Sequence, residues 1–288
     1  HAGVDKDNYT ITLGTANNYV VGKQAITYDI AAGNITYGAA DSAGSISYSA
    51  LETGDVVSAS AQIDDRALST AEKLKAGTYT QSINGSHAGV DKDNYTITLG
   101  TANNYTVNAK AITVSGINAE SKVYNGNTEA TIDVSLASFT DLVDGDTVTV
   151  SATGTFSDKN VDTGKIVTLS ETYAGTDRNN YTITSQGSTT ANITAAPLTY
   201  SVAANDKTYD GDTEATATLT LAGYINTETL TETNSSTFDT KNVGSNKTVT
   251  VNSITLADGT NGGLASNYSI STGGTTTANI TQLTSVTW

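Results

Sequence analysis

The sequence has no cysteine, no methionine, a single proline (Pro197) and only two histidines. Without cysteine the chain has neither disulfides nor a thiolate nucleophile. The histidines, His1 and His87, stand at the same position in two copies of one segment. They therefore supply no zinc ligand set and no converging Ser-His-Asp group. Counting alone leaves paired carboxylates for glycoside hydrolysis open. A duplicated sequence nevertheless favours a repeated structural part over one catalytic cleft, so we expect the chain not to be an enzyme.

Charged residues are also scarce, and those present are mostly acidic. They make up 15% of the chain, against roughly 25% in ordinary globular proteins. The formal net charge of −15 has the wrong sign for binding nucleic-acid phosphates or anionic membranes. No apolar run approaches the roughly 20 residues that span a bilayer. We therefore expect neither nucleic-acid binding nor membrane insertion.

What the sequence does have is internal repetition. His1–Tyr19 returns letter for letter as His87–Tyr105, which indicates a module of about 86 residues. Because the sequence opens inside a repeat, we expect it to be a piece of a longer protein. The predicted organisation is a remnant of a preceding module at residues 1–24, followed by modules at 25–110, 111–195 and 196–288.

Each module reads as short β-rich segments separated by turn residues. In the second module, Thr147–Thr153 and Ile166–Ser170 are candidate strands, and Asn125-Gly126 is one of the turn signals. The junctions at Asn108–Thr113 and Thr194–Thr199 pass from strand to strand through a few small residues, without a flexible Gly/Ser linker. We predict a mostly β chain of tandem small antiparallel β-sandwich or β-grasp-like modules, arranged end to end, with at most short helical turns.

The second and third modules share an ordered series of motifs. Lys122–Thr131 returns as Lys207–Thr216, Lys159-Asn160-Val161 returns as Lys241-Asn242-Val243, and an Asn-Tyr pair and an Ala-Asn-Ile-Thr segment follow in both. This series resembles the YDG repeat domain of large secreted bacterial adhesins. The first module resembles the companion MBG domain through Tyr37-Gly38, Leu51–Val57 and Asn94-Tyr95. The resemblance implies mostly β domains in a stalk or adhesive segment at the bacterial surface or in a biofilm matrix, and hence an extracellular location.

The tyrosines of these motifs have two interpretations. Tyr124 with Gly126, and Tyr209 with Gly211, lie at turn signals, which favours a structural ring packed over a tight hairpin turn. The other interpretation is an exposed aromatic platform for stacking against a sugar. Three further tyrosines follow asparagine at the start of a late strand, where a hydroxyl can tie a loop to the end of the sheet. They are Tyr95, Tyr181 and Tyr268.

Pairs of acidic residues raise the question of calcium, which needs six to eight oxygen ligands. No segment matches an EF-hand loop with its terminal glutamate, and acidic loops are expected on a chain of this charge. We therefore expect no cofactor, with Ca²⁺ as the one ion considered. The candidate ligands are Asp91, Asp93, Asp144, Asp146, Asp210 and Asp212.

The sequence thus predicts a structural stalk or spacer that extends a distal binding region from the cell surface. Its expected partners are adjacent modules of the same chain. The alternative is a module that binds carbohydrate or a host or abiotic surface through repeated exposed tyrosine and asparagine side chains. Buried tyrosines would favour the spacer, whereas two or more exposed tyrosines beside Asn or Asp in a groove would favour the binding module.

Overall fold

The computed structural model describes residues 14–15 and 18–284. The described residues are mostly β, in small sheets that follow one another along the chain, as the sequence predicts. Contacts between Cα atoms divide the chain into two compact units. Unit 1 is His1–Lys110 with Val143–Asp146 and Asn179–Thr182, and unit 2 is Ala111–Leu142, Thr147–Arg178 and Ile183–Trp288. We keep the terms first, second and third repeat for residues 25–110, 111–195 and 196–288, whose bounds remain predictions.

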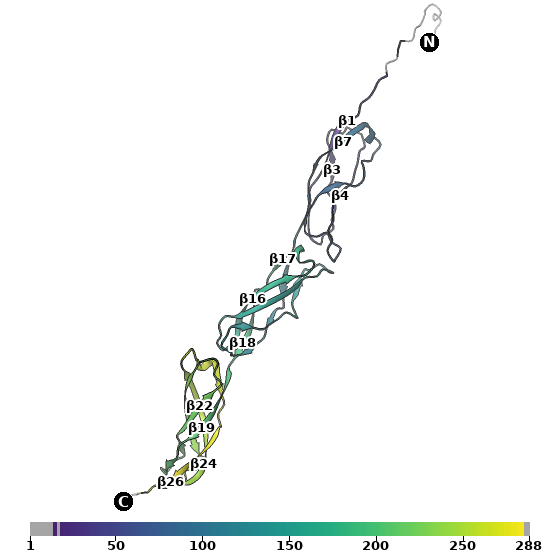
Figure 1. Cartoon of the computed structure of the whole chain (residues 1–288). Helices are drawn as coiled ribbons and strands as arrows, with labels where there is room; N and C mark the ends of the chain where they lie inside the picture. The colour runs from purple at the N-terminus through teal and green to yellow at the C-terminus, as the bar shows by residue number, and fades with distance from the viewer. Residues whose placement is uncertain (1–13, 16–17, 285–288) are drawn as a thin grey trace, which may run out of the picture. The chain divides into compact units, whose positions relative to one another are not determined.

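The first repeat is built from short strands (Figure 1). One three-stranded sheet has the order β3-β1-β7 and another the order β2-β8-β5, while β4 and β6 form an antiparallel pair. The strands are β1 (Gln24–Ile30), β2 (Gly33–Thr36), β3 (Ile46–Tyr48), β4 (Ala61–Ile63), β5 (Gly77–Tyr79), β6 (Gln81–Ile83), β7 (Tyr95–Ala102) and β8 (Tyr105–Asn108).

The second repeat contains a five-stranded sheet of order β11-β18-β16-β15-β12 and a three-stranded sheet of order β14-β9-β17. A small pair, β10 with β13, completes it. The strands are β9 (Lys110–Ser115), β10 (Asn118–Ala119), β11 (Lys122–Val123), β12 (Glu129–Ala130), β13 (Ile132–Asp133), β14 (Ser138–Thr140), β15 (Thr149–Phe156), β16 (Asp162–Ala174), β17 (Tyr181–Thr184) and β18 (Ser188–Thr194).

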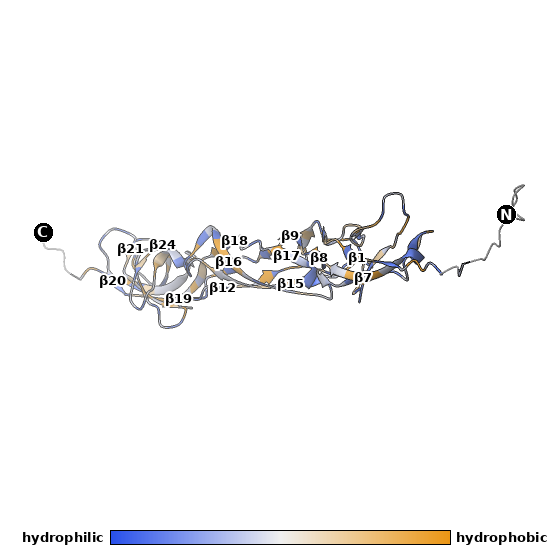
Figure 2. Ribbon diagram, turned by 90° about the horizontal axis from the view of Figure 1, so that it is seen from above, coloured by the Kyte–Doolittle hydropathy of each residue, from blue (hydrophilic) through white to orange (hydrophobic). Residues whose placement is uncertain are grey.

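The third repeat has the same topology. Its five-stranded sheet has the order β20-β26-β24-β23-β21, and its three-stranded sheet the order β22-β19-β25. The strands are β19 (Ala196–Ala204), β20 (Lys207–Thr208), β21 (Glu214–Ala215), β22 (Ala217–Ala222), β23 (Leu230–Phe238), β24 (Gly244–Asp258), β25 (Tyr268–Ile270) and β26 (Thr275–Thr281). Polar and apolar residues lie side by side along the strands (Figure 2), as expected for strands with one buried face.

The long hairpins of the second and third repeats form the centre of each core. Phe156 pairs with Val167 across β15 and β16, and Phe238 pairs with Val249 across β23 and β24. All four side chains are buried. In unit 2 the core around Phe156 and Val167 is continuous with Leu198, Leu230 and Tyr268 of the third repeat. The two repeats of unit 2 therefore share apolar packing.

Not every strand pair is antiparallel. The first strand of a repeat lies parallel to a late strand, as in β1 with β7 and β19 with β25. The intervening hairpins supply the long crossover that a parallel pair requires. The alternation of polar and apolar residues predicts a half-buried strand but not its direction, so these parallel pairs do not follow from the sequence pattern.

Among the described residues, helical structure is limited to three 3-10 turns: η2 (Lys92–Asn94), η3 (Arg178–Asn180) and η4 (Ala265–Asn267). Each ends on the asparagine of an Asn-Tyr pair, and the tyrosine begins the next strand. Of the remnant at residues 1–24, residues 1–13 and 16–17 lie outside the described part. Tyr19, Val20 and Val21 are described and form no strand, since their side chains are 91%, 83% and 80% exposed and have no strand beside them.

Candidate functional site: tyrosine–carboxylate joints

Tyr95, Tyr181 and Tyr268, which directly follow the three 3-10 turns, make the same two hydrogen bonds. The Tyr268 hydroxyl accepts a hydrogen bond from the Ile225 amide at 3.1 Å and donates one to Glu228 Oε2 at 2.7 Å. Because the acid follows the amide by three residues, one loop provides both partners. The ring is buried at the start of β25, so the hydroxyl ties this loop to the end of the sheet.

The same arrangement recurs in unit 1. The Tyr181 hydroxyl accepts from the Val143 amide at 3.1 Å and donates to Asp146 at 2.5 Å. The Tyr95 hydroxyl accepts from the Glu52 amide at 3.2 Å and donates to Asp55 at 2.5 Å. The three loops differ in sequence, but each places an acid three residues after the amide that the tyrosine binds.

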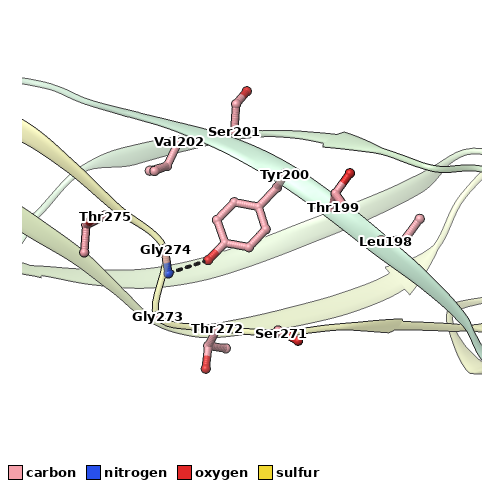
Figure 3. Close-up of a pocket in the computed structure, with 10 residues that line it drawn as sticks. All are labelled: Leu198, Thr199, Tyr200, Ser201, Val202, Ser271, Thr272, Gly273, Gly274 and Thr275. Atoms are coloured by element: carbon pink, nitrogen blue, oxygen red, sulfur yellow. Dashed lines mark hydrogen bonds between the residues drawn. The ribbon is translucent and has the colours of Figure 1, made fainter.

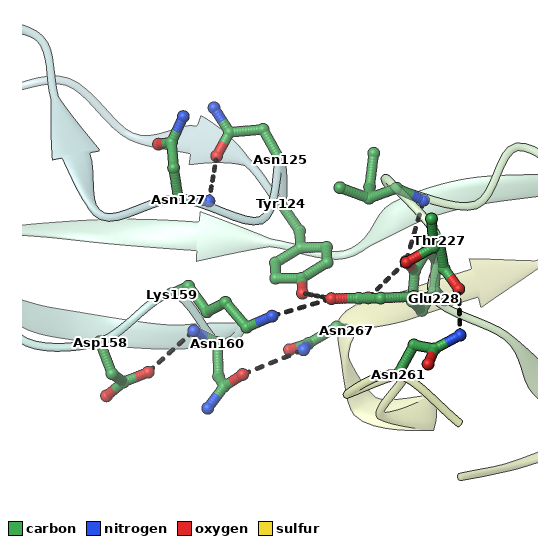
Figure 4. A network of polar contacts seen from close by, with 12 residues as sticks. Tyr124, Asn125, Asn127, Asp158, Lys159, Asn160, Thr227, Glu228, Asn261 and Asn267 are labelled. Carbon is green, nitrogen blue, oxygen red and sulfur yellow. Dashed lines mark hydrogen bonds and ion pairs between the residues drawn. The ribbon is translucent and has the colours of Figure 1, made fainter. Parts of the chain in front are cut away.

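A second tyrosine reaches two of these acids. In unit 2, Tyr124 of the YDG-like turn donates to Glu228 Oε1 at 2.7 Å (Figure 4). The Tyr124 ring meets the Tyr268 ring edge to face, with 5.6 Å between the ring centres. In unit 1, Tyr37 donates to Asp146 at 2.6 Å and meets Tyr181 edge to face at 5.3 Å. Each of these carboxylates thus accepts hydrogen bonds from two buried tyrosines.

Unit 2 adds a cation to this cluster. Lys159 Nζ lies 2.8 Å from Glu228 Oε1 and 5.9 Å from the centre of the Tyr124 ring (Figure 4). Burial raises the pKa of the Glu228 carboxyl, but hydrogen bonds from Lys159, Tyr268 and Tyr124 outweigh it and leave that pKa below its usual value. Glu228 is therefore a buried carboxylate held in its charged form by its partners.

Asn267 completes the cluster, which we call the Glu228 joint (Tyr124, Lys159, Glu228, Asn267 and Tyr268). The side-chain oxygen of Asn267 accepts a hydrogen bond from the Val161 amide at 2.9 Å. The side-chain nitrogen of Asn267 donates to Asn160 at 3.1 Å (Figure 4). Tyr124, Lys159, Asn160 and Val161 belong to the second repeat, and Glu228, Asn267 and Tyr268 to the third. The joint therefore links the two repeats of unit 2 through buried polar contacts.

Tyr209 stands at the position of Tyr124 but not in the same environment. The Tyr124 side chain is 1% exposed, whereas Tyr209 is 36% exposed. The expectation that both rings are buried structural elements is therefore wrong for Tyr209. The reason is that Tyr124 is covered by the loop and the Asn-Tyr pair of the next repeat, and no described residue follows to cover Tyr209 in that way.

Lys122 and Lys207, each two residues before one of these tyrosines, bind groups of the turn that follows. Lys122 Nζ donates to the backbone oxygens of Asn127 and Glu129 and lies 5.2 Å from the centre of the Phe156 ring. Lys207 Nζ makes ion pairs with Asp210 and Asp212 and lies 5.7 Å from the Phe238 ring. The hydrogen bond from Lys207 keeps the pKa of Asp210 below its usual value. Gly126 and Gly211, two residues after the tyrosines, have φ of +80° and +94°, which glycine adopts without strain.

Five of the six candidate calcium ligands contact protein groups, and the six do not form a cluster. Asp210 and Asp212 both bind Lys207, and Asp146 accepts from two tyrosines. Asp91 accepts from the Val56 amide and Asp93 pairs with Lys92, while for Asp144 the structure gives no side-chain contact. Among the described residues, no three His, Cys, Asp or Glu side chains come together as metal ligands would.

A groove of about 660 Å³ in the third repeat lies between β19 and the loop before β26. Tyr200 lies across it and accepts a hydrogen bond from the Gly274 amide at 2.9 Å (Figure 3). The other side chains that line it are uncharged: Leu198, Thr199, Ser201, Val202, Ser271, Thr272 and Thr275. The groove contains one aromatic ring and no charged side chain.

Comparison with known proteins gives the family. The sequence profile of the YDG domain matches residues 108–191 and 194–284, which is more than half of the chain. The chain therefore belongs to the YDG domain family. No curated protein matches it. A crystal structure of the I9-I11 tandem from titin is similar at 13% identity over 92% of this chain and 98% of that chain, but its TM-score of 0.18 supports no argument.

Proposed function

We propose that this chain is a non-catalytic spacer segment of an exported bacterial adhesin, in which consecutive domains hold one another in a fixed relation. The Glu228 joint is the observation that carries the proposal. A carboxylate of the third repeat is buried and charged, and two of its partners, Tyr124 and Lys159, come from the second repeat. Separating the repeats would leave that carboxylate without those partners, which is costly.

The chain path supports the same role. β18 ends at Thr194 and β19 begins at Ala196, so a single residue joins the two strands. Pro197, the second residue of β19, has a fixed φ and no amide hydrogen. A connection this short restricts bending between the second and third repeats far more than a Gly/Ser linker would.

The exported, cell-surface setting comes from the likeness of the first repeat to MBG domains together with the YDG membership of the rest. An acidic surface poor in lysine and arginine is consistent with that setting, since it disfavours adhesion to nucleic acid and anionic membranes. Among the residues that the structure describes, no helix has the length and apolar character needed to cross a bilayer.

Carbohydrate binding is the second candidate function. The Tyr200 groove contains one ring, and the hydroxyl of that ring is already bonded to Gly274. Of the motif tyrosines, Tyr209 is 36% exposed, and the others are buried and unavailable for stacking: Tyr37, Tyr95, Tyr124, Tyr181 and Tyr268. These observations favour the spacer over repeated sugar-stacking sites.

The absence of native cysteine makes a distance test direct. We would introduce Leu136→Cys and Thr220→Cys, both at exposed positions of unit 2, and measure the distance between attached spin labels. A spacer requires a narrow distance distribution, which broadens when Glu228→Ala and Tyr124→Ala are added. A broad distribution in the parent chain would contradict the spacer role.

A glycan array probed with the same chain tests the alternative. Glycan binding that Tyr200→Ala abolishes would favour carbohydrate binding over the spacer role.

A further inference from the structure

The third repeat has residues that correspond to the second-repeat side of the Glu228 joint, with Tyr209 and Lys241 in the positions of Tyr124 and Lys159. No domain among the described residues packs against them. Gly126 and Gly211 illustrate the difference. A methyl group at Gly126 would lie 2.9 Å from both Asn226 and Ile225, in the loop of the next repeat, whereas a methyl group at Gly211 would meet nothing within 4 Å. The turn at Gly126 is in contact with a neighbouring domain, and the turn at Gly211 is open.

The residues around the two turns correspond one by one. Lys241, Asn242 and Val243 of the third repeat stand where the second repeat has Lys159, Asn160 and Val161. All three are exposed in the third repeat, with Val243 at 52%. Their counterparts are only partly exposed, because the next repeat covers them. The Tyr209 hydroxyl forms no hydrogen bond to any described residue.

These residues surround a shallow pocket of about 420 Å³, lined by Tyr209, Asn242, Val243, Gln282 and Leu283. In the second repeat, the positions of Gln282 and Leu283 are held by Ala195 and Ala196, where the next domain begins. The ring of Tyr209 thus borders a cavity in the place where the ring of Tyr124 packs against Tyr268.

We propose that this surface, the Tyr209 face (Tyr209, Gly211, Lys241, Asn242 and Val243), binds the acidic-loop end of another domain of the YDG family. The ligand chemistry is a loop carboxylate together with an Asn-Tyr pair. The Tyr209 hydroxyl donates to the carboxylate and Lys241 pairs with it, while the Val243 amide donates to the asparagine side chain. The occupied Glu228 joint shows each of these contacts made by the corresponding residues.

Charge and shape both favour this occupant. The face combines one cation, one free phenol and an exposed backbone amide, so it complements a carboxylate with a neighbouring amide side chain. A sugar would match the phenol but would leave Lys241 without an anionic partner. The inference rests on the tandem-domain part of the proposed function and on neither the adhesin assignment nor cell-surface export.

The test extends the chain by one domain in the register of the existing junction. Residues 1–281 are joined directly to a second copy of residues 195–288, so that Thr281 takes the place of Thr194. Hydrogen exchange of the amides around Tyr209–Thr213 and Lys241–Gly244 is then compared with the unextended chain. We expect exchange there to slow by about tenfold or more, because these amides become buried.

Two matched variants of the extended chain locate the effect. One variant has Glu228→Gln only in the added copy, and the other has Tyr209→Phe only in residues 1–281. Each should lose much of the protection that the extension gives to the amides at the Tyr209 face. The slow-exchanging amides inside the added copy should stay protected, which shows that it is folded. Unchanged exchange at the Tyr209 face beside a folded added copy would overturn the proposal, as would protection that neither variant reduces.

Two further results bear on the inference. Gly211→Ala strains the turn in both chains, because φ at this position is +94°, and it should in addition remove protection that only the extended chain has. Equal effects in both chains would count against docking at this face. The spin-label distances within unit 2 report on the spacer role separately. If the Tyr209 face gains no protection while the spin-label distance distribution in unit 2 is narrow, this inference is wrong and the proposed function is unaffected.

Discussion

At the scale of single residues, Tyr124 and Tyr209 form a natural matched pair, with the same motif in two environments. We expect Tyr124→Ala to lower the free energy of unfolding of unit 2 by about 2–4 kcal/mol, because it removes a buried ring and a hydrogen bond to Glu228. Tyr209→Ala should cost about 1 kcal/mol or less, since its ring is already 36% exposed. Urea unfolding of the two variants measures the difference.

Tyr124→Phe serves as the control for ring packing, and its loss should be smaller because the ring remains. Equal losses for Tyr124→Ala and Tyr209→Ala would mean that contact with the next repeat adds nothing to stability.

Glu228 gives a prediction for pH. Its folded-state pKa lies below the ordinary value, so its stabilising contribution is present above the unfolded pKa of about 4.3 and is lost as the pH falls through the lower folded value. We expect the stability difference between the parent chain and Glu228→Gln to be largest near neutral pH and to shrink below about pH 4.3. Thermal melts from pH 7 to pH 3 measure it.

The matched control for that experiment is Glu120→Gln, which changes an exposed carboxylate. If Glu228→Gln and Glu120→Gln show the same dependence on pH, the ion pair with Lys159 contributes nothing specific.

Sequence reasoning located the tyrosines of the joints but not their acceptors. An Asn-Tyr pair at the start of a late strand marks Tyr95, Tyr181 and Tyr268, but it also marks Tyr105, whose hydroxyl accepts from the Ser42 amide. Asp146 was considered as a calcium ligand, although its oxygens accept from tyrosines. Asp55 and Asp146 both follow glycine in a Leu-x-x-Gly-Asp-x-Val series, but Glu228 follows Asn226-Thr227. Only the spacing of three residues from the loop amide relates Glu228 to the other two acids. That spacing was the available signal.

At the scale of elements, comparing alanine substitutions at Gly126 and Gly211 separates the cost of backbone strain from the cost of a clash with the next repeat. Both have positive φ, so alanine is strained at either position. Gly126→Ala must in addition displace Asn226 and Ile225, and we expect it to cost about 1 kcal/mol more than Gly211→Ala. Denaturant unfolding of the two variants provides the comparison, and a larger loss for Gly211→Ala would contradict it.

The strands themselves were largely predictable, and their partners were not. Alternation of polar and apolar residues indicates β15 and β16 because each has one buried face. Strands of two residues, such as β11 and β12, carry too few residues for any period to be visible. The parallel pairing of β19 with β25 depends on contacts far apart in sequence, which local pattern does not encode.

At the scale of the whole molecule, the shared core and the Glu228 joint predict coupled unfolding of the second and third repeats. We expect calorimetry to give one transition for unit 2 in the parent chain, since neither repeat keeps its full set of buried partners alone. Combining Tyr124→Ala with Glu228→Gln should split that transition into two. Tyr209→Ala, the control outside the joint, should leave it single.

A carboxylate held jointly by two domains has a consequence for the order in which such an array comes apart. Each domain then contributes an intrinsic stability and an interface term with each neighbour, as in a one-dimensional nearest-neighbour system. A domain between two occupied joints has two interface terms, and a domain with an open Tyr209 face has one. Unfolding under load should therefore begin at a free end, so that the length of an array protects its middle.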